Sequence, residues 1–239
     1  MSTRLFGLPG QIASARFCGP SLASPPSSRA WRLLIALIAH AGAEAGADTA
    51  HVIALDDLRD GQGVHFKTAP DLLDLISELR SATMTRDGGQ GAFGLLEWAS
   101  VLMHDGSRFL RWRFTDQVRS AFACPDGWAE MDRQALRALP GRYAMQLYSL
   151  VALHRSAKRY QSIYTLDQLR ARLGFPDGTL SAPCSLLAAI RRTIADVNRE
   201  AGLKISLRPI RHQRQIEAVE LSWRGVPAFK RSAGRLGRP

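Results

Sequence analysis

The sequence lacks any apolar run of about 18 residues, the length that a membrane-spanning helix needs. The longest candidate, residues 31–41, is interrupted by Arg32 and His40. Cysteine is also scarce, and the three cysteines lie far apart, at Cys18, Cys124 and Cys184. Their odd number and spacing exclude a disulfide framework and a zinc-finger site and indicate a reducing compartment. We therefore expect a cytoplasmic protein with no membrane partner.

The motifs of common catalytic sites are missing as well. No G-x-x-x-x-G-K-[ST] loop is present to hold phosphates, and no G-x-G-x-x-G follows an expected strand. Tyr160 and Tyr164 have the Y-x-x-x-Y spacing of some nicking initiators. That chemistry also needs a His-hydrophobic-His pair for its metal, which the sequence does not contain. The sequence therefore argues against an enzyme and predicts no catalytic residue, no metal ligand and no cofactor.

Acidic residues become scarce in the second half of the chain. Residues 1–130 carry 12 Lys and Arg against 14 Asp and Glu, whereas residues 131–239 carry 20 against 7. The second half therefore accounts for the whole net charge of +11. Such an asymmetry indicates a polyanionic partner, most often nucleic acid, and the alternative is a solvated basic surface.

Residues 1–27 show no sustained periodicity and end in a stretch rich in Ser and Pro. The segment contains arginine and no acid, so a transit peptide is one interpretation. Glycines and prolines interrupt any long amphipathic helix within it, however, and it has no secretory hydrophobic core. We expect a flexible N-terminal arm.

From residue 28 the pattern indicates a helix, a strand, a short helix, a helix and a two-stranded hairpin. Ser28 is the expected N-cap of the first helix, and Pro70 suits the first turn of the last. Apolar residues recur at helical spacing in both, at Trp31, Leu34, Ile35 and Ile38 and at Leu72, Leu75, Ile76 and Leu79. The hairpin strands are expected at residues 93–98 and 108–114.

The second half repeats this order although the two sequences barely match. Thr165-Leu-Asp-Gln168 is a capping box that opens a short helix, and Gly174 ends it. The other expected elements are helices at 115–123, 131–138 and 183–201, strands at 204–207 and 216–223, and an arginine-rich loop at 208–215. Two short helices followed by a hairpin is the order of a winged helix-turn-helix.

Because this order occurs twice, we predict an α+β fold of two tandem winged helix-turn-helix domains with small antiparallel β-hairpin wings. The expected limits are a flexible arm at 1–27, a first winged-helix domain at 28–130, a second at 131–226 and a basic C-terminal tail at 227–239. The second domain carries the positive charge, so we expect it to be the main DNA-binding domain.

The helix at residues 183–201 is the candidate recognition helix. When its apolar stripe faces inward, the opposite face carries Ser185, Ala188, Arg191, Arg192, Ala195 and Arg199. Small residues let a helix approach base edges, and arginine can bond guanine at two atoms. We expect Arg191 and Arg192 to contact bases and Ser185 and Arg199 to contact phosphates. The alternative is an ordinary amphipathic surface helix.

Two further basic segments are candidates for DNA contact. The expected loop between the last two strands contains Arg208, Arg211, His212 and Arg214. At a hairpin tip these residues would enter a minor groove or straddle phosphates, and the alternative is a solvated loop. A second group, Arg155, Lys158 and Arg159, follows a helix that ends near residue 154. We interpret these residues either as contacts to the DNA backbone or as positive charges that interact favourably with the dipole at the C-terminus of that helix.

The corresponding helix of the first domain carries Asp71, Asp74 and Glu78 on its expected exposed side, where they would repel phosphate. Any DNA contact by this domain would use other residues, such as Arg80 or Arg111. We therefore expect the first domain to serve dimerisation or an auxiliary DNA contact.

Four segments of the second half occur in a set order: 135–151 (ALRALPGRYAMQLYSLV), 164–174 (YTLDQLRARLG), 190–198 (ending in ADVN) and the closing 203–223. In this order they resemble the iteron-binding plasmid replication initiators. The family patterns run roughly L-x-S-x-Y-A-x-R-L-Y-E-L-L, I-x-L-E-E-L-R-x-x-L-G and L-x-x-A-x-x-E-I-N, before a final hairpin. The sequence departs from them at Gln146, where the family usually has Arg.

The resemblance implies a function on double-stranded DNA. Such initiators bind directly repeated origin sequences, the iterons, and promote opening of an adjacent A·T-rich segment. They recruit the host replication initiator and the replicative helicase, and their dimers often repress their own promoter. The resemblance therefore implies a homodimer–monomer equilibrium and a plasmid- or nucleoid-associated place in the cytoplasm. The alternative on this fold is a dimeric transcriptional regulator bound to a palindromic operator, because operator symmetry mirrors protein symmetry.

Overall fold

The computed structural model of the chain describes residues 5–18, 26–61, 64–85, 92–176, 178–213 and 215–225. The helices are α1 (Gly10–Ala13), α2 (Ser28–Ala41), η1 (Gly42–Gly46), η2 (Asp57–Gly61), α3 (Ala69–Ser81), α4 (Asp116–Ala123), α5 (Arg133–Ala138), α6 (Arg142–Ser156), α7 (Leu166–Leu173) and α8 (Pro183–Ala201). The strands of the first half are β1 (Leu5–Pro9), β2 (Arg16–Cys18), β3 (His51–Ala54), β4 (Thr83–Thr85), β5 (Ala92–Gly94), β6 (Leu96–His104) and β7 (Ser107–Phe114). Those of the second half are β8 (Trp128–Asp132), β9 (Gln161–Thr165), β10 (Leu203–His212) and β11 (Gln215–Gly225).

Two sheets share one topology and confirm the predicted repeat. Their strand orders are β3-β7-β6 and β9-β11-β10, and all pairs are antiparallel. In each sheet, the strand before the short helix pairs with the second strand of the hairpin. A short helix and a longer helix, η2–α3 or α7–α8, connect the first strand to the hairpin. This is the winged helix-turn-helix arrangement, so the predicted α+β fold is confirmed.

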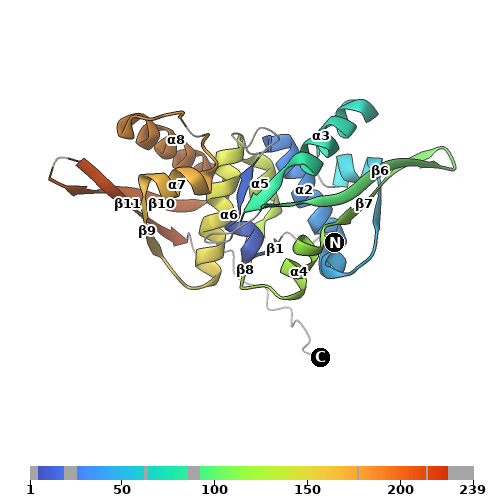
Figure 1. The fold of residues 1–239 in the computed structure, drawn as a ribbon, viewed down its shortest axis with the longest axis horizontal. Coiled ribbons are helices and arrows are strands. Elements are labelled where there is room, and N and C mark those ends of the chain that lie inside the picture. The colour runs from blue at the N-terminus through green and yellow to red at the C-terminus, as the bar shows by residue number, and fades with distance from the viewer. Residues whose placement is uncertain are drawn as a thin grey trace.

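We call α2 to β7 the first winged-helix unit and α6 to β11 the second. Figure 1 shows the units side by side along the long axis of the molecule, with their hairpins β6–β7 and β10–β11 at opposite ends. The helices α3 and α8 lie along the same edge, one in each unit. The buried apolar side chains form one continuous core that runs through both units.

The local helix signals were predicted well. The side chain of Thr165 accepts from Gln168 N at 3.1 Å, and that of Gln168 accepts from Thr165 N at 3.0 Å, so the capping box is confirmed. Gly174 ends α7 with φ 73°, a left-handed conformation that favours glycine. Ser27, one residue before the predicted Ser28, caps α2 by accepting from Ala30 N at 3.2 Å.

The prediction of a flexible arm over residues 1–27 is wrong for residues 5–18. These residues form β1, α1 and β2, and β1 pairs with β8 while β2 pairs with β4. Leu8 and Ile12 are almost fully buried. The strands find their hydrogen-bond partners far along the chain, and segments of three to five residues are too short to show a period. The rest of the predicted arm within 1–4 and 19–25 lies outside the described residues.

One expected strand, one expected helix and one expected loop also need correction. The predicted strand 93–98 is two strands, because β5 pairs with β4 and β6 pairs with β7. The predicted helix 131–138 begins only at Arg133, since β8 lies beside β1. The predicted loop 208–215 is mostly hairpin, because β10 continues to His212 and β11 begins at Gln215. The predicted tail 227–239 lies outside the described residues.

A reciprocal pair of hydrogen bonds joins the first unit to the helix that precedes the second. Arg32, near the start of α2, donates from Nη2 to the carbonyl of Leu139, just after α5, at 2.6 Å. Arg133, the first residue of α5, donates from Nη2 to the carbonyl of Ala39, in the last turn of α2, at 3.4 Å. Carbonyls at a helix C-terminus lack intrahelical partners and carry partial negative charge. Each helix thus receives at its C-terminal end a cation from the start of the other.

Burial of the N-terminal segment predicts a large stability effect. Ile12 is 1% exposed, so Ile12→Ala is expected to lower the free energy of unfolding by about 2–5 kcal/mol. Leu73→Ala is the matched control, because Leu73 is 46% exposed and its loss is expected to cost less than about 1 kcal/mol. Urea unfolding of the two variants measures the difference. Equal stabilities would show that residues 5–18 do not belong to the core.

Candidate nucleic-acid interface

The helix α8 buries one face and exposes the other, as the sequence predicts. Leu187, Ile190 and Val197 are at most 4% exposed and pack in the core. The opposite face is exposed and carries Ser185, Ala188, Arg191, Arg192, Ala195 and Arg199. Pro183 starts the helix, and Gly202 ends it with φ 60°. The exposed face is therefore long and basic and carries small side chains, which suits a helix that enters a major groove.

The arginines of this face differ in what they contact. Arg199 forms ion pairs with Asp196 at 2.8 Å and Glu200 at 2.7 Å, and these carboxylates raise the pKa of its guanidinium. Within the part of the chain that the structure describes, Arg191 and Arg192 form no ion pair. A DNA base or phosphate would bind their guanidinium groups without first displacing a carboxylate. Arg191 and Arg192 therefore stay the strongest candidates for groove contact.

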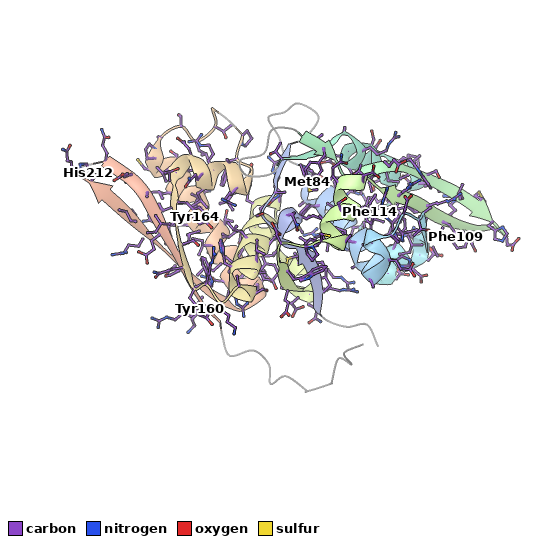
Figure 2. The ribbon with its side chains drawn as sticks, turned by 60° about the horizontal axis from the view of Figure 1, so that its bottom comes forward. Met84, Phe109, Phe114, Tyr160, Tyr164 and His212 are labelled. Carbon is purple, nitrogen blue, oxygen red and sulfur yellow. The ribbon has the colours of Figure 1, made fainter. Side chains whose placement is uncertain are left out.

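The hairpin β10–β11 brings only part of the predicted tip group together. Arg211 and His212 are exposed beside the turn, where Gln213 has φ 55°. Figure 2 shows His212 at the outer end of the hairpin. Arg208 lies farther down the strand, and its Nε donates to Glu220 Oε2 at 3.1 Å, so its charge is already paired across the sheet. Arg214 lies outside the described residues.

The group Arg155, Lys158 and Arg159 lies at the other end of the sheet. Trp223 fixes this end, because its backbone N donates to Tyr160 O at 3.0 Å and its Nε1 donates to Arg159 O at 2.8 Å. Trp223 is eight residues along β11 from Gln215, or about 26 Å at the rise of a strand. Figure 2 shows Tyr160 and His212 at opposite ends of the sheet. These three residues stay candidate phosphate contacts only for DNA that reaches this far end.

Two acids of α3 accept hydrogen bonds from other residues of the first unit and from the N-cap of α2. Asp71 Oδ2 accepts from Arg29 Nη2 at 2.6 Å, and this bond lowers the pKa of the Asp71 carboxyl. The carboxylate of Glu78 accepts from the backbone N of Ser27 and, at 2.8 Å, from its hydroxyl. Asp71 and Glu78 therefore hold the start of α2, a role that sequence reasoning missed because the partners are more than 40 residues away. Only Asp74 remains as an exposed, unpaired acid of the predicted three in the described structure.

Two arginines beside each other near the first sheet, Arg113 of β7 and Arg119 of α4, are paired as well. Arg113 contacts Asp48 and Glu97, and Arg119 contacts Asp116 and Glu97. Arg111 lies over the ring of Trp98, with its Cζ 5.3 Å from the centroid. The two units thus share a topology but differ in electrostatics, because Arg29 and Arg113 of the first unit are paired with acids, whereas Arg191 and Arg192 of α8 form no ion pair in the described structure.

Two other kinds of site are absent from the described residues. No helix in the described ranges is long and apolar enough to cross a membrane. Within the same ranges, no group of three or more His, Cys, Asp or Glu side chains could hold a metal ion.

Comparison with known proteins finds similarity in structure. No family model and no curated protein sequence matches the chain. The fold is similar to that of the Pi initiator protein in a crystal structure with iteron DNA, with a TM-score of 0.67 and 15% identity over 93% of this chain and 98% of that chain. Two crystal structures of domains 2 and 3 of RctB overlap less. Their TM-scores are 0.46 and 0.42, at 11% and 13% identity over 83% and 81% of this chain and 82% and 80% of theirs.

The similarity to the Pi initiator protein extends over almost the full length of both chains. It shows that this chain shares the fold of the Pi initiator protein. The predicted resemblance is therefore confirmed at the level of the fold. A shared fold does not by itself fix a function, and the function rests on the residues of the site.

The unpaired arginines of α8 predict a loss of sequence-specific binding. Arg191→Ala and Arg192→Ala are each expected to weaken binding to the preferred duplex by about 1–3 kcal/mol and to relax the base preference. Arg224→Ala is the control, because Arg224 is exposed at the base of the hairpin, opposite Lys204, and loses the same charge. Fluorescence anisotropy at fixed salt measures all three. Equal losses in the three variants would contradict a groove contact by α8.

The hairpin residues predict an effect on salt dependence. Arg211→Ala is expected to weaken binding to all sequences alike and to reduce the slope of log K against log [salt] by about one unit, because one phosphate contact is lost. Arg208→Ala is expected to change the slope less, since Arg208 is paired with Glu220. Titrations over a series of salt concentrations give these slopes. A larger effect for Arg208→Ala would place the DNA on the strand face instead of the tip.

Proposed function

We propose that the chain is a plasmid replication initiator that binds directly repeated origin DNA, the iterons, sequence-specifically through its two winged-helix units. The observation that carries the proposal is the exposed face of α8, where Arg191 and Arg192 are unpaired in the described structure. The helix occupies the recognition position of a winged-helix unit. The shared fold supports the same function, because the Pi initiator protein was crystallised with iteron DNA.

The arrangement of the units supports binding of a single chain along one duplex. Figure 1 shows α3 and α8 on one edge, so both helices face the same side of the molecule. Successive major grooves on one face of B-DNA are about 34 Å apart, or one helical turn. The two units have different surfaces, because α3 exposes Asp74 whereas α8 exposes Arg191 and Arg192 without an ion pair in the described structure. We therefore infer an asymmetric site of about two turns, read mainly by the second unit.

The first unit supports contact with another protein. Its sheet exposes two apolar side chains on one face, Val52 (47%) and Leu102 (42%). Exposed apolar side chains grouped on one sheet mark a surface for association. We propose that this unit serves dimerisation, by which the chain represses its own promoter, or contact with the host replication initiator and helicase. Opening of the A·T-rich segment would then follow from binding and bending of the duplex, without catalysis by this chain.

The symmetry of the preferred DNA tests the proposal. Selection from random duplexes with the full chain, at near-physiological salt, is expected to enrich an asymmetric motif of about two helical turns, found as tandem direct repeats. A palindrome would instead favour a dimeric transcriptional regulator. Binding without any enriched motif, lost as salt rises, would contradict both functions and leave only a general polyanion contact.

A further inference from the structure

The hairpin β6–β7 of the first unit ends in an apolar side chain that the core does not cover. Met103 is 68% exposed, the largest exposed fraction of any large apolar side chain in the described structure. It lies directly opposite Arg108 on the neighbouring strand. The face of the hairpin that carries this pair also carries Leu110, which is fully buried. Met103 therefore continues the apolar face of the sheet beyond the point where the core ends.

The turn after Met103 fixes the register of the tip. Asp105 and Gly106 have φ values of 48° and 75°, and the last pair of the two strands is His104 with Ser107. Positive φ at both central residues is the requirement of a type I′ turn, which the dipeptide Asp-Gly favours. The Asp105 carboxylate lies 3.3 Å from Nε2 of His104, so the acid of the turn contacts its own neighbour. Asp105 is thus explained by the turn.

The hairpin of the second unit carries a comparable pair at its own tip. Arg211 of β10 lies opposite Ile216 of β11. Arg211 is exposed, but Ile216 is partly buried and packs against the core. Each tip therefore combines one arginine with one apolar side chain across the two strands. Only the first tip leaves its apolar side chain open to another molecule.

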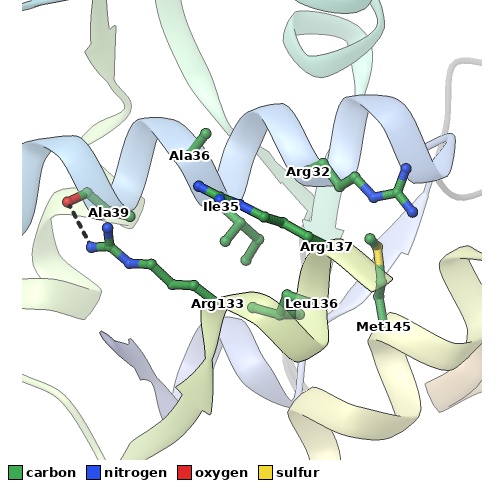
Figure 3. Close-up of a pocket in the computed structure, with 8 residues that line it drawn as sticks. All are labelled: Arg32, Ile35, Ala36, Ala39, Arg133, Leu136, Arg137 and Met145. Carbon is green, nitrogen blue, oxygen red and sulfur yellow. Dashed lines mark hydrogen bonds between the residues drawn. The ribbon is translucent and has the colours of Figure 1, made fainter. Parts of the chain in front are cut away.

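The two tips lie beyond the helices α3 and α8 along the molecule. Figure 1 shows α3 and α8 on one edge, with the hairpins β6–β7 and β10–β11 projecting past them at opposite ends. A duplex that crosses both helices by successive major grooves presents a minor groove about half a turn farther out on each side. The body between the tips is held by a continuous core and by contacts such as that of Arg133 with Ala39 (Figure 3). A duplex that touches a tip must therefore adapt its own shape to this body.

The chemistry of the first tip matches the minor groove of DNA. Apolar side chains such as methionine insert between base pairs from the minor groove, unstack them in part and kink the duplex by about 20–90°. Methionine is unbranched and flexible, so its side chain can enter a groove that is about 6 Å wide. A guanidinium group beside it is attracted by the negative potential of the groove. Met103 and Arg108 together therefore provide both parts of a minor-groove wedge.

We propose that Met103 is a wedge that enters the minor groove of the bound duplex beside the first unit and kinks it there, with Arg108 as the cation that holds the tip in the groove. The inference rests on the proposed function, because it takes the duplex to lie along α3 and α8. It gives the first unit a mechanical role on DNA although its helix α3 exposes Asp74, which repels phosphates. The kink is expected at a pyrimidine–purine step, since such steps unstack most easily.

The experiment measures unstacking and bending of the preferred duplex by the full chain. The fluorescent base 2-aminopurine is placed at successive positions toward each end of the duplex, and a pair of dyes at the two ends reports the bend by energy transfer. The wild-type chain is expected to raise the 2-aminopurine fluorescence at one step and to bend the duplex by at least about 20°. Met103→Gln keeps the length of the side chain but loses its apolar end, and is expected to lose both signals. Met103→Leu keeps an apolar end and is expected to keep both.

Ile163→Gln is the matched control. Ile163 is 61% exposed on β9 of the second unit, so the change removes a similar apolar side chain at a distance from the tip. This variant is expected to keep both signals. Equal midpoints of thermal unfolding for all the variants show that the fold is intact, as the exposure of both positions leads us to expect.

The possible results separate this inference from the proposed function. A straight duplex with the wild-type chain, or a kink that Met103→Gln retains, overturns the wedge and leaves sequence-specific binding, measured separately by anisotropy, untouched. A retained kink together with weaker self-association of Met103→Gln in sedimentation also overturns it and assigns the tip to a protein interface. If selection enriches no motif, the proposed function fails, and the same comparison on an A·T-rich duplex at low salt decides whether Met103 kinks DNA.

Discussion

The arrangement of the two winged-helix units depends on the contact between α2 and α5. Each helix places an arginine from its first turns on the C-terminal carbonyls of the other, through Arg32 and Leu139 and through Arg133 and Ala39. Hydrogen bonds from charged donors are stronger than those between neutral groups, and the bonds also satisfy carbonyls that a helix end leaves open. The pairing of β1 with β8, directly before α5, adds a second connection at the same place. With this region fixed, α3 and α8 lie along one edge.

The two units show how one topology can serve two purposes. In the first unit, Arg29 and Arg113 are bound by acids of the same unit. In the second, Arg191 and Arg211 are exposed and have no ion pair in the described structure. Desolvating an ion pair costs energy, and an arginine that is already paired offers less to a phosphate. The expected difference in function between the units therefore follows from which arginines are paired with acids. The strand order, which the units share, does not show this difference.

The successful predictions rest on sequence patterns between residues that are close along the chain. The capping box at Thr165, the left-handed Gly174 and the apolar stripe of α8 all depend on residues three or four apart, which a sequence shows directly. The failures involve distant partners. The strand β1 pairs with residues more than 100 positions away, and Glu78 bonds to Ser27, the N-cap of α2. The strands β10 and β11 also occupy most of the residues expected to form a loop. Arg208 of β10 lies opposite Glu220 of β11 and pairs with it, and this register is visible only in the folded sheet.

What the positive charge of the second half can bind depends on where its basic side chains lie in the fold. Its arginines and lysines fall into separate groups, on α8, on the hairpin, at the far end of the sheet near Tyr160, and on α5 beside α2. A net charge predicts a polyanionic partner but not a surface. The group on α8 combines exposed arginines that have no ion pair in the described structure with small side chains that let a helix approach base edges, and we therefore expect it to carry the sequence specificity.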